Sequence, residues 1–129
     1  PTSTATGGLN TAAKAAGKLF FGTAVDNGSL NDSPYRAILN DVKEFGQLTP
    51  ANSMKWDATE ASRGTFTFTN GDAIVDVAKA NGQLVRGHTT VWHSQLPSWV
   101  SNGNFDNSTL ISIVQNHVTT VVDHYKGNM

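Results

Sequence analysis

Cysteine is missing from this chain of 129 residues, which excludes disulfide bridges and thiolate metal sites. Long apolar runs are missing too: the longest, such as Leu19 to Phe21, span a few residues, whereas a membrane helix needs roughly 20. The nine lysines and arginines are scattered between Lys14 and Lys126, and the net charge is -1. We therefore expect no nucleic-acid partner and no membrane partner. The length and composition fit one soluble domain.

A signal-peptide pattern is also absent, as it would be from a processed secreted protein. Three sequons for N-glycosylation are present, beginning at Asn27, Asn31 and Asn107. Matches to so short a motif arise readily by chance, so they permit an extracellular location without establishing it.

Helical and strand-like segments alternate along the sequence. Apolar residues at spacings of three and four, with caps and stops such as Ser33-Pro34, Gly46, Gly82 and Gly127, predict helices over residues 10–16, 33–46, 71–80 and 107–127. Short apolar segments predict strands over residues 19–25, 46–51 and 84–92. Such alternation is typical of a parallel sheet with crossover helices. Residues 57–70 are expected to form a long loop after the second strand, where α/β folds place binding sites.

The stretch RGHTTVWHSQLPSW, residues 86–99, is rich in histidine and tryptophan. If residues 84–92 are extended, His88 and Trp92 point to one side and His93 to the other, so a metal shared by the two histidines is disfavoured. Two interpretations stay open. The aromatic residues could pack in the core, or an indole face and polar side chains could line a sugar-binding site.

A second polar and aromatic cluster, PANSMKW at residues 50–56, follows the second predicted strand. It carries Asn52, Lys55 and Trp56. Residues just past neighbouring parallel strands lie close together, so we expect the two clusters to line one site.

These segments carry a family resemblance. GQLTPANSMKWDAT, RGHTTVWHSQLPSWV and NHVTTVVDHYKGNM resemble the corresponding stretches of glycoside hydrolase family 10, the fungal endo-1,4-β-xylanases, and the resemblance covers residues 9–129. It implies a TIM (β/α)8 barrel, of which this chain supplies an N-terminal helix and the first three β/α units. The implied activity is endo-hydrolysis of β-1,4-xylosidic bonds in xylan by a retaining double displacement, without a cofactor, in a secreted enzyme.

The resemblance also implies roles for individual residues. Asn52 and Lys55 match positions that hydrogen-bond a xylose two sites to the non-reducing side of the cleaved bond. His88, Trp92 and Gln95 match positions around the sugar whose bond is broken. The remaining aromatic residues of the two clusters, Trp56, His93 and Trp99, are expected to pack in the interior.

Three positions depart from the family pattern. Ala51 stands where the family usually has a glutamate that accepts hydrogen bonds from the distal xylose, so we expect weaker sugar binding there. Thr90 replaces a leucine and Ala61 a proline, and both replacements look tolerable.

The chain also lacks the catalytic pair. A retaining glycosidase needs two carboxyl groups about 5 Å apart, yet the only glutamates, Glu44 and Glu60, match neither catalytic position. A TIM barrel takes about 250 residues. We therefore expect residues 1–129 to be the amino-terminal segment of one catalytic barrel domain, incomplete and inactive alone and completed by a second chain or a missing C-terminal segment. Two other readings stay open: a non-catalytic carbohydrate-binding module and a free-standing doubly wound α/β domain.

Overall fold

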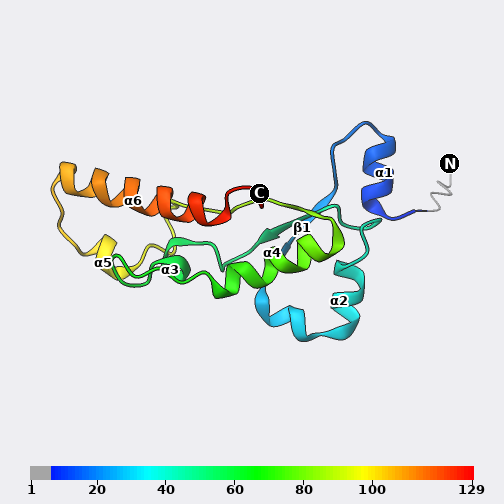
Figure 1. The fold of residues 1–129 in the computed structure, drawn as a ribbon, viewed down its shortest axis with the longest axis horizontal. Helices are drawn as coiled ribbons and strands as arrows, with labels where there is room; N and C mark the ends of the chain where they lie inside the picture. Colours follow the sequence, from blue (N-terminus) through cyan, green and yellow to red (C-terminus); the bar gives the residue numbers. More distant parts are fainter. Residues whose placement is uncertain (1–6) are drawn as a thin grey trace.

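A parallel β-sheet of three strands lies at the centre of the computed structural model, which describes residues 7–129 (Figure 1). The strands are β1 (Gly22–Val25), β2 (Gln47–Pro50) and β3 (Leu84–Val85), in the spatial order β1-β2-β3. Gly22 pairs with Gln47, and Gln47 pairs with Leu84. The predicted parallel sheet is confirmed, and the carboxyl ends of all three strands lie at one edge.

Helices connect and cover these strands. They are α1 (Leu9–Ala15), the 3-10 helix η1 (Asn27–Asn31), α2 (Ser33–Leu39), α3 (Trp56–Thr59), α4 (Thr69–Asn81), α5 (Ser98–Ser101) and α6 (Asn107–Tyr125). Aspartates cap two of them: Asp32 accepts a hydrogen bond from the backbone N–H of Tyr35, and Asp106 accepts one from that of Thr109. Gly82 ends α4 with φ 68°, a left-handed conformation that glycine adopts without strain.

Several predicted boundaries were wrong. The helix that begins at Ser33 ends at Leu39 rather than Gly46, because residues 40–46 form turns and a bend. The predicted loop over residues 57–70 shares its first residues with α3. The predicted strand over residues 84–92 is paired only at Leu84 and Val85. Its ladder with β2 pairs Gln47 with Leu84 and Leu48 with Val85, and the N–H of Arg86 donates to the carbonyl of Leu48 at 3.0 Å beyond the last pair.

The sheet is held by an apolar core between β2 and the helices. Val25, Leu48 and Ile74 are at most 1% exposed and form one cluster with residues of α2 and α4. A second cluster joins α4 to α6 and consists of Met54, Val75, Val121 and Tyr125. Tyr125 is so deeply buried that its pKa is raised, because burial disfavours the phenolate. The two clusters hold in place the residues that precede and follow β2. The predicted site lies after β2.

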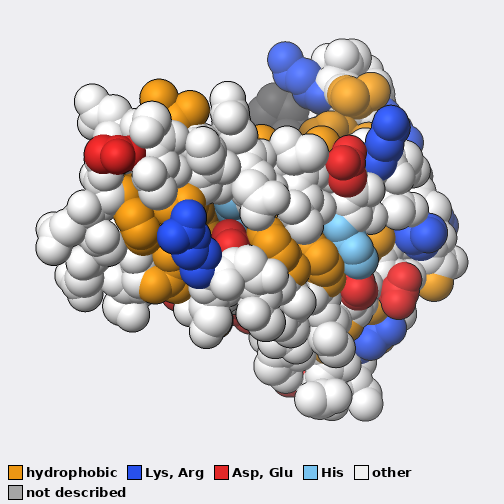
Figure 2. Space-filling model, turned by 60° about the vertical axis from the view of Figure 1, so that its left-hand side comes forward, with side chains coloured by type: hydrophobic (Ala, Val, Ile, Leu, Met, Phe, Trp, Pro, Cys, Tyr) orange, Lys and Arg blue, Asp and Glu red, His pale blue; other side chains and the backbone are white. Residues whose placement is uncertain are grey.

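Apolar side chains also reach the surface. Leu19 is 76% exposed and Ile111 57%, and Figure 2 shows apolar side chains spread across one face. Within residues 7–129, β1 and β3 each pair with a neighbour on one side only. Of the helices described there, none combines the length and apolar character needed to cross a membrane.

Candidate sugar-binding site

Five residues predicted to bind sugar follow the carboxyl ends of β2 and β3. Asn52 and Lys55 come directly after β2, whereas His88, Trp92 and Gln95 belong to the irregular segment after β3. Because the two strands are parallel neighbours, these segments meet at the same edge of the sheet. Lys55 contacts both Asn52 and Gln95. The structure thus brings together side chains that are 43 positions apart in the sequence.

Lys55 is the centre of this group. It is 8% exposed, and its Nζ donates hydrogen bonds to Asn52 Oδ1 at 2.8 Å and to Gln95 Oε1 at 2.5 Å. The same Nζ lies 4.6 Å from the centre of the Trp92 ring, a cation–π contact. Among residues 7–129 no carboxylate forms an ion pair with it. An ammonium has three donor hydrogens, so one remains to donate to a ligand.

Asn52 is oriented by Asp26, a residue that the sequence reasoning missed. Asn52 is exposed, and its Nδ2 donates to Asp26 Oδ1 at 2.9 Å. This bond directs the amide oxygen of Asn52 toward Lys55. Asp26 directly follows β1, just as Asn52 and Lys55 follow β2, so its position after a predicted strand was the available signal.

Gln95 has an unusual backbone conformation. Its φ is 56°, in the left-handed region that costs a residue with a Cβ about 1 kcal/mol or more. The carbonyl of Gln95 accepts a hydrogen bond from the backbone N–H of Asp57 at 3.2 Å, and its side chain accepts the bond from Lys55. These two contacts hold the segment after β3 against the segment after β2.

His88 and Trp92 form an aromatic wall beside Lys55. Their ring centres lie 6.4 Å apart with planes at 50°, and Trp92 is 37% exposed. Because the strand ends at Val85, the predicted separation of His93 onto the opposite face was wrong: the His93 ring contacts Trp92 edge-on at 5.1 Å. An exposed indole face next to a buried ammonium is suited to a ring that is apolar on its faces and polar at its edge.

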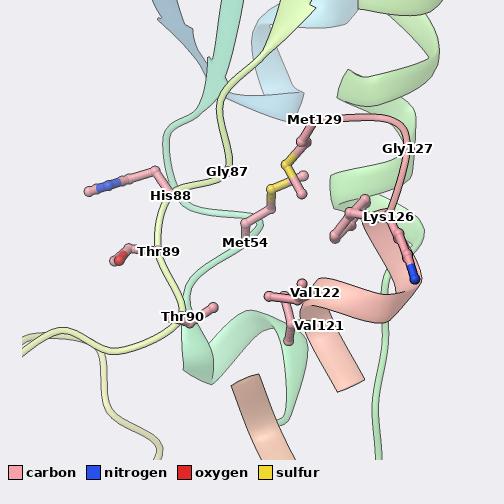
Figure 3. A pocket seen from close by; sticks show the side chains of 11 residues that line it. Met54, Gly87, His88, Thr89, Thr90, Val121, Val122, Lys126, Gly127 and Met129 are labelled. Carbon is pink, nitrogen blue, oxygen red and sulfur yellow. The ribbon is translucent and has the colours of Figure 1, made fainter. Parts of the chain in front are cut away.

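An apolar hollow of about 460 Å³ lies between residues 87–90 and α6. Figure 3 shows the Met54 and Met129 side chains pointing toward one another inside it, while the His88 side chain points away. Apart from His88, the residues grouped around Lys55 do not line this hollow, which Val121 and Val122 also line.

The buried residue Glu60 links the segment that follows β2 to the segment that follows β3. Glu60 is 2% exposed and accepts hydrogen bonds from Trp56 Nε1 at 3.0 Å, from the Gly64 N–H at 2.7 Å and from His117 Nδ1 at 2.9 Å, in the tautomer that carries a proton there. Its carbonyl accepts from Trp99 Nε1 at 3.0 Å. Burial lowers the pKa of His117, although the Glu60 carboxylate opposes this effect. The network thereby ties the helix that follows Lys55 to α6 and to the segment after Gln95.

The aromatic residues expected to pack fall into different environments. Trp56 is 3% exposed, stacks on His117 with ring centres 4.2 Å apart and meets Trp99 edge-on at 6.2 Å. Trp99 is half-buried, whereas His93 is exposed and its recorded ring contact is with Trp92. Packing therefore describes Trp56 and Trp99, whereas the expectation that His93 packs in the interior was wrong, because its side chain is exposed.

The two glutamates do not face the site. The Glu60 carboxylate is fully engaged in the buried network, and Glu44 accepts a hydrogen bond from the backbone N–H of Leu9, near the start of α1. Glu44 precedes β2 and so lies at the opposite end of that strand from Lys55. Neither glutamate therefore supplies a carboxyl group to the site around Lys55.

Residues 8–129 match the model of Glycosyl hydrolase family 10. The chain belongs to this family. An endo-1,4-beta-xylanase of Agaricus bisporus is 64% identical over 94% of this chain and 36% of its own length, and endo-1,4-beta-xylanase A of Phanerodontia chrysosporium is 63% identical over 98% and 31%. A solved family 10 xylanase of Bispora sp. MEY-1 with xylobiose superposes with a TM-score of 0.87 at 43% identity, over 94% of this chain and 38% of that one.

Family membership confirms the expected fold class. The three parallel strands and their helices are part of the family's TIM (β/α)8 barrel. The chain spans about a third of the length of the curated relatives it matches. This third of the barrel carries Lys55 and the residues grouped around it.

Proposed function

We propose that this chain forms the non-reducing side of the substrate cleft of an endo-1,4-β-xylanase, as the amino-terminal segment of a single catalytic barrel domain. Asn52 and Lys55 bind a xylose two sites before the cleaved bond. His88, Trp92 and Gln95 bind the xylose whose bond is broken. The substrate is xylan or a xylo-oligosaccharide, and the enzyme acts outside the cell that secretes it.

The buried ammonium of Lys55 carries this proposal. Its hydrogen bonds to Asn52 and Gln95 leave one donor hydrogen free, and the Trp92 ring lies beside the ammonium group. Sugar hydroxyls accept from such a donor, while the C–H face of a pyranose lies against an indole. Similarity to a family 10 xylanase solved with xylobiose supports the same class of ligand.

Catalysis then depends on groups from the rest of the barrel. A retaining mechanism needs one carboxylate as nucleophile and a second carboxyl group as acid and base, about 5 Å apart. Glu44 and Glu60 are engaged elsewhere, so a completing segment or second chain supplies both. The role of this chain is to bind and orient the sugar units before the cleaved bond.

A graft tests the proposal. Residues 8–129 replace the matching segment of the Agaricus bisporus relative, and the product, called the grafted enzyme below, is assayed on xylan beside the 129-residue chain alone. We expect the grafted enzyme to release reducing ends and the chain alone to release none. Lys55→Ala should lower kcat/KM by about tenfold or more, because a hydrogen bond to a charged group contributes about 1.5–3 kcal/mol.

Asp76→Ala is the matched control, since Asp76 is an exposed charged residue on α4. It should leave kcat/KM within about twofold of the unmodified grafted enzyme, as expected for a surface substitution. Turnover by the purified chain alone, or full activity of the Lys55→Ala variant, would contradict the proposal.

A further inference from the structure

The three sequons of the chain lie in different surroundings in the structure. Asn107 is exposed and begins α6, Asn31 is exposed and ends η1, and Asn27 begins η1 and is half-buried. A glycan is bulky and hydrated, so the asparagine that carries it in a folded protein must lie at the surface with its amide free. The three positions can therefore be compared on these two conditions.

Asn107 meets both conditions. Within residues 7–129, no recorded hydrogen bond uses its side chain. The helix is capped by Asp106, whose Oδ1 accepts from the Thr109 N–H at 2.7 Å and from the Ser108 hydroxyl at 3.0 Å. Side chains of a helix tilt toward its N-terminus, so the side chain of the first residue points past the end of the helix. Figure 1 shows this end of α6 far from the β-sheet.

The chain that leads to Asn107 is held by aromatic contacts. The Phe105 ring meets Trp99 edge-on with ring centres 6.4 Å apart. The Arg63 guanidinium lies 5.2 Å from the centre of the same Phe105 ring. A glycan on Asn107 would displace neither contact, because the Asn107 side chain takes part in neither of them.

The amide of Asn27, by contrast, is already engaged. Its Nδ2, the atom to which a glycan would be attached, donates to the carbonyl of Asn70 at 2.7 Å and so ties η1 to the start of α4. Asn27 also lines a hollow of about 450 Å³ whose wall includes Asn52 of the Lys55 site. A glycan there would enter this hollow and stand beside residues proposed to bind xylose.

Asn31 is exposed, but the residues that follow it disfavour glycan transfer. The donor of the glycan is an anionic lipid diphosphate, and Asp32, the middle residue of this sequon, adds a negative charge that repels it. Ser33 is followed directly by Pro34, which restricts the backbone of the residue before it. The sequon at Asn107 has a serine in the middle and no proline after it.

We propose that Asn107 carries an N-linked glycan in the secreted protein and that Asn27 and Asn31 carry none. The proposal rests on the secretion that is part of the proposed function, but on no step of catalysis. In the transfer, Asn107 Nδ2 attacks C1 of the first sugar of a lipid diphosphate-linked oligosaccharide. The N–C1 bond forms, the C1–O bond breaks with its electron pair going to the lipid diphosphate, and the amide loses one proton.

Peptide mapping of the grafted enzyme, secreted from a yeast host, tests the assignment. A glycosidase that releases N-linked glycans converts each occupied asparagine to an aspartate, which carries heavy oxygen if the digest is made in labelled water. A parallel digest without the glycosidase is the control, because Asn27 precedes Gly28 and such pairs also deamidate spontaneously. We expect label at Asn107 in most molecules and none above the control at Asn27 or Asn31.

Two substitutions of Thr109 give a matched pair. Thr109→Ala removes the sequon hydroxyl but keeps the backbone N–H that bonds Asp106, so the intact mass should fall by one glycan. Thr109→Ser keeps the hydroxyl, so the glycan should remain. Because Thr109 lies outside the Lys55 site, kcat/KM on xylan should stay within about twofold in both variants, as is usual for substitutions away from buried groups.

The outcomes separate this proposal from the proposed function. An unlabelled Asn107, or an intact mass that Thr109→Ala leaves unchanged, would overturn the assignment, and label at Asn27 or Asn31 would overturn the choice among the sequons. Activity on xylan is measured on the same sample. An active enzyme without label at Asn107 refutes the glycan and leaves the proposed function standing, whereas a labelled but inactive enzyme refutes the proposed function and leaves the glycan standing.

Discussion

Replacing Glu60 by glutamine should destabilise the protein without a change in side-chain volume. The Glu60 carboxylate accepts hydrogen bonds from three buried donors, which belong to Trp56, Gly64 and His117. The glutamine amide keeps one acceptor oxygen and turns an NH2 group toward at least one of these donors. A hydrogen bond to a charged group contributes about 1.5–3 kcal/mol. We therefore expect Glu60→Gln to lower the free energy of unfolding by about 2 kcal/mol.

Urea unfolding of the grafted enzyme, followed by tryptophan fluorescence, measures this loss. Glu44→Gln is the matched control, because the same chemical change is made where the carboxylate accepts one long backbone hydrogen bond at 3.3 Å. The control should stay within about 0.5 kcal/mol of the unmodified protein, as surface substitutions usually do. If Glu60→Gln were no more destabilising than Glu44→Gln, the buried network would not hold the site segments as described.

Two further predictions concern His117 and Ala51. Burial lowers the pKa of His117 in the folded protein. Its contribution to stability is therefore fully present above the pKa of the unfolded chain, about 6.5, and is lost as the pH falls below that value. The urea midpoint should decline less steeply from pH 8 to pH 5 in His117→Gln, and an unchanged slope would contradict this. Ala51→Glu should tighten xylo-oligosaccharide binding about fivefold in the grafted enzyme whose nucleophilic glutamate has been replaced, since one added hydrogen bond contributes about 1 kcal/mol. Calorimetry that shows no gain in affinity would refute the role assigned to this position.

The sequence predicted the parallel sheet and the longer helices because these follow from periodicity. The apolar spacing in α4 and α6 and the stop at Gly82 are local signals, and both helices were found near their predicted bounds. The end of α2 at Leu39 was missed because the predicted stop, Gly46, lies several residues beyond the turns that end the helix. The cap of α6, Asp106, lies one residue before the predicted start of that helix at residue 107.

The site was predictable in part. Residues after β2 and β3 were expected to meet because parallel strands end at one edge, and Lys55 does contact Asn52, Gln95 and Trp92. The predicted strand ended at Val25, as β1 does, so Asp26 was placed just past its end, but no pattern in the sequence indicated its hydrogen bond to Asn52. The buried Glu60–His117 pair joins residues 57 positions apart, and a charged residue in a predicted loop gave no sign that it would be buried.

The role of Lys55 is tested by a crystal structure, with xylotriose bound, of the grafted enzyme whose catalytic nucleophile has been replaced. We expect a xylose hydroxyl within hydrogen-bond distance of Lys55 Nζ and of the Asn52 side chain, with the ring of the neighbouring unit close to His88 and Trp92. A sugar bound elsewhere in the barrel, with Lys55 still bonded only to Asn52 and Gln95, would contradict it.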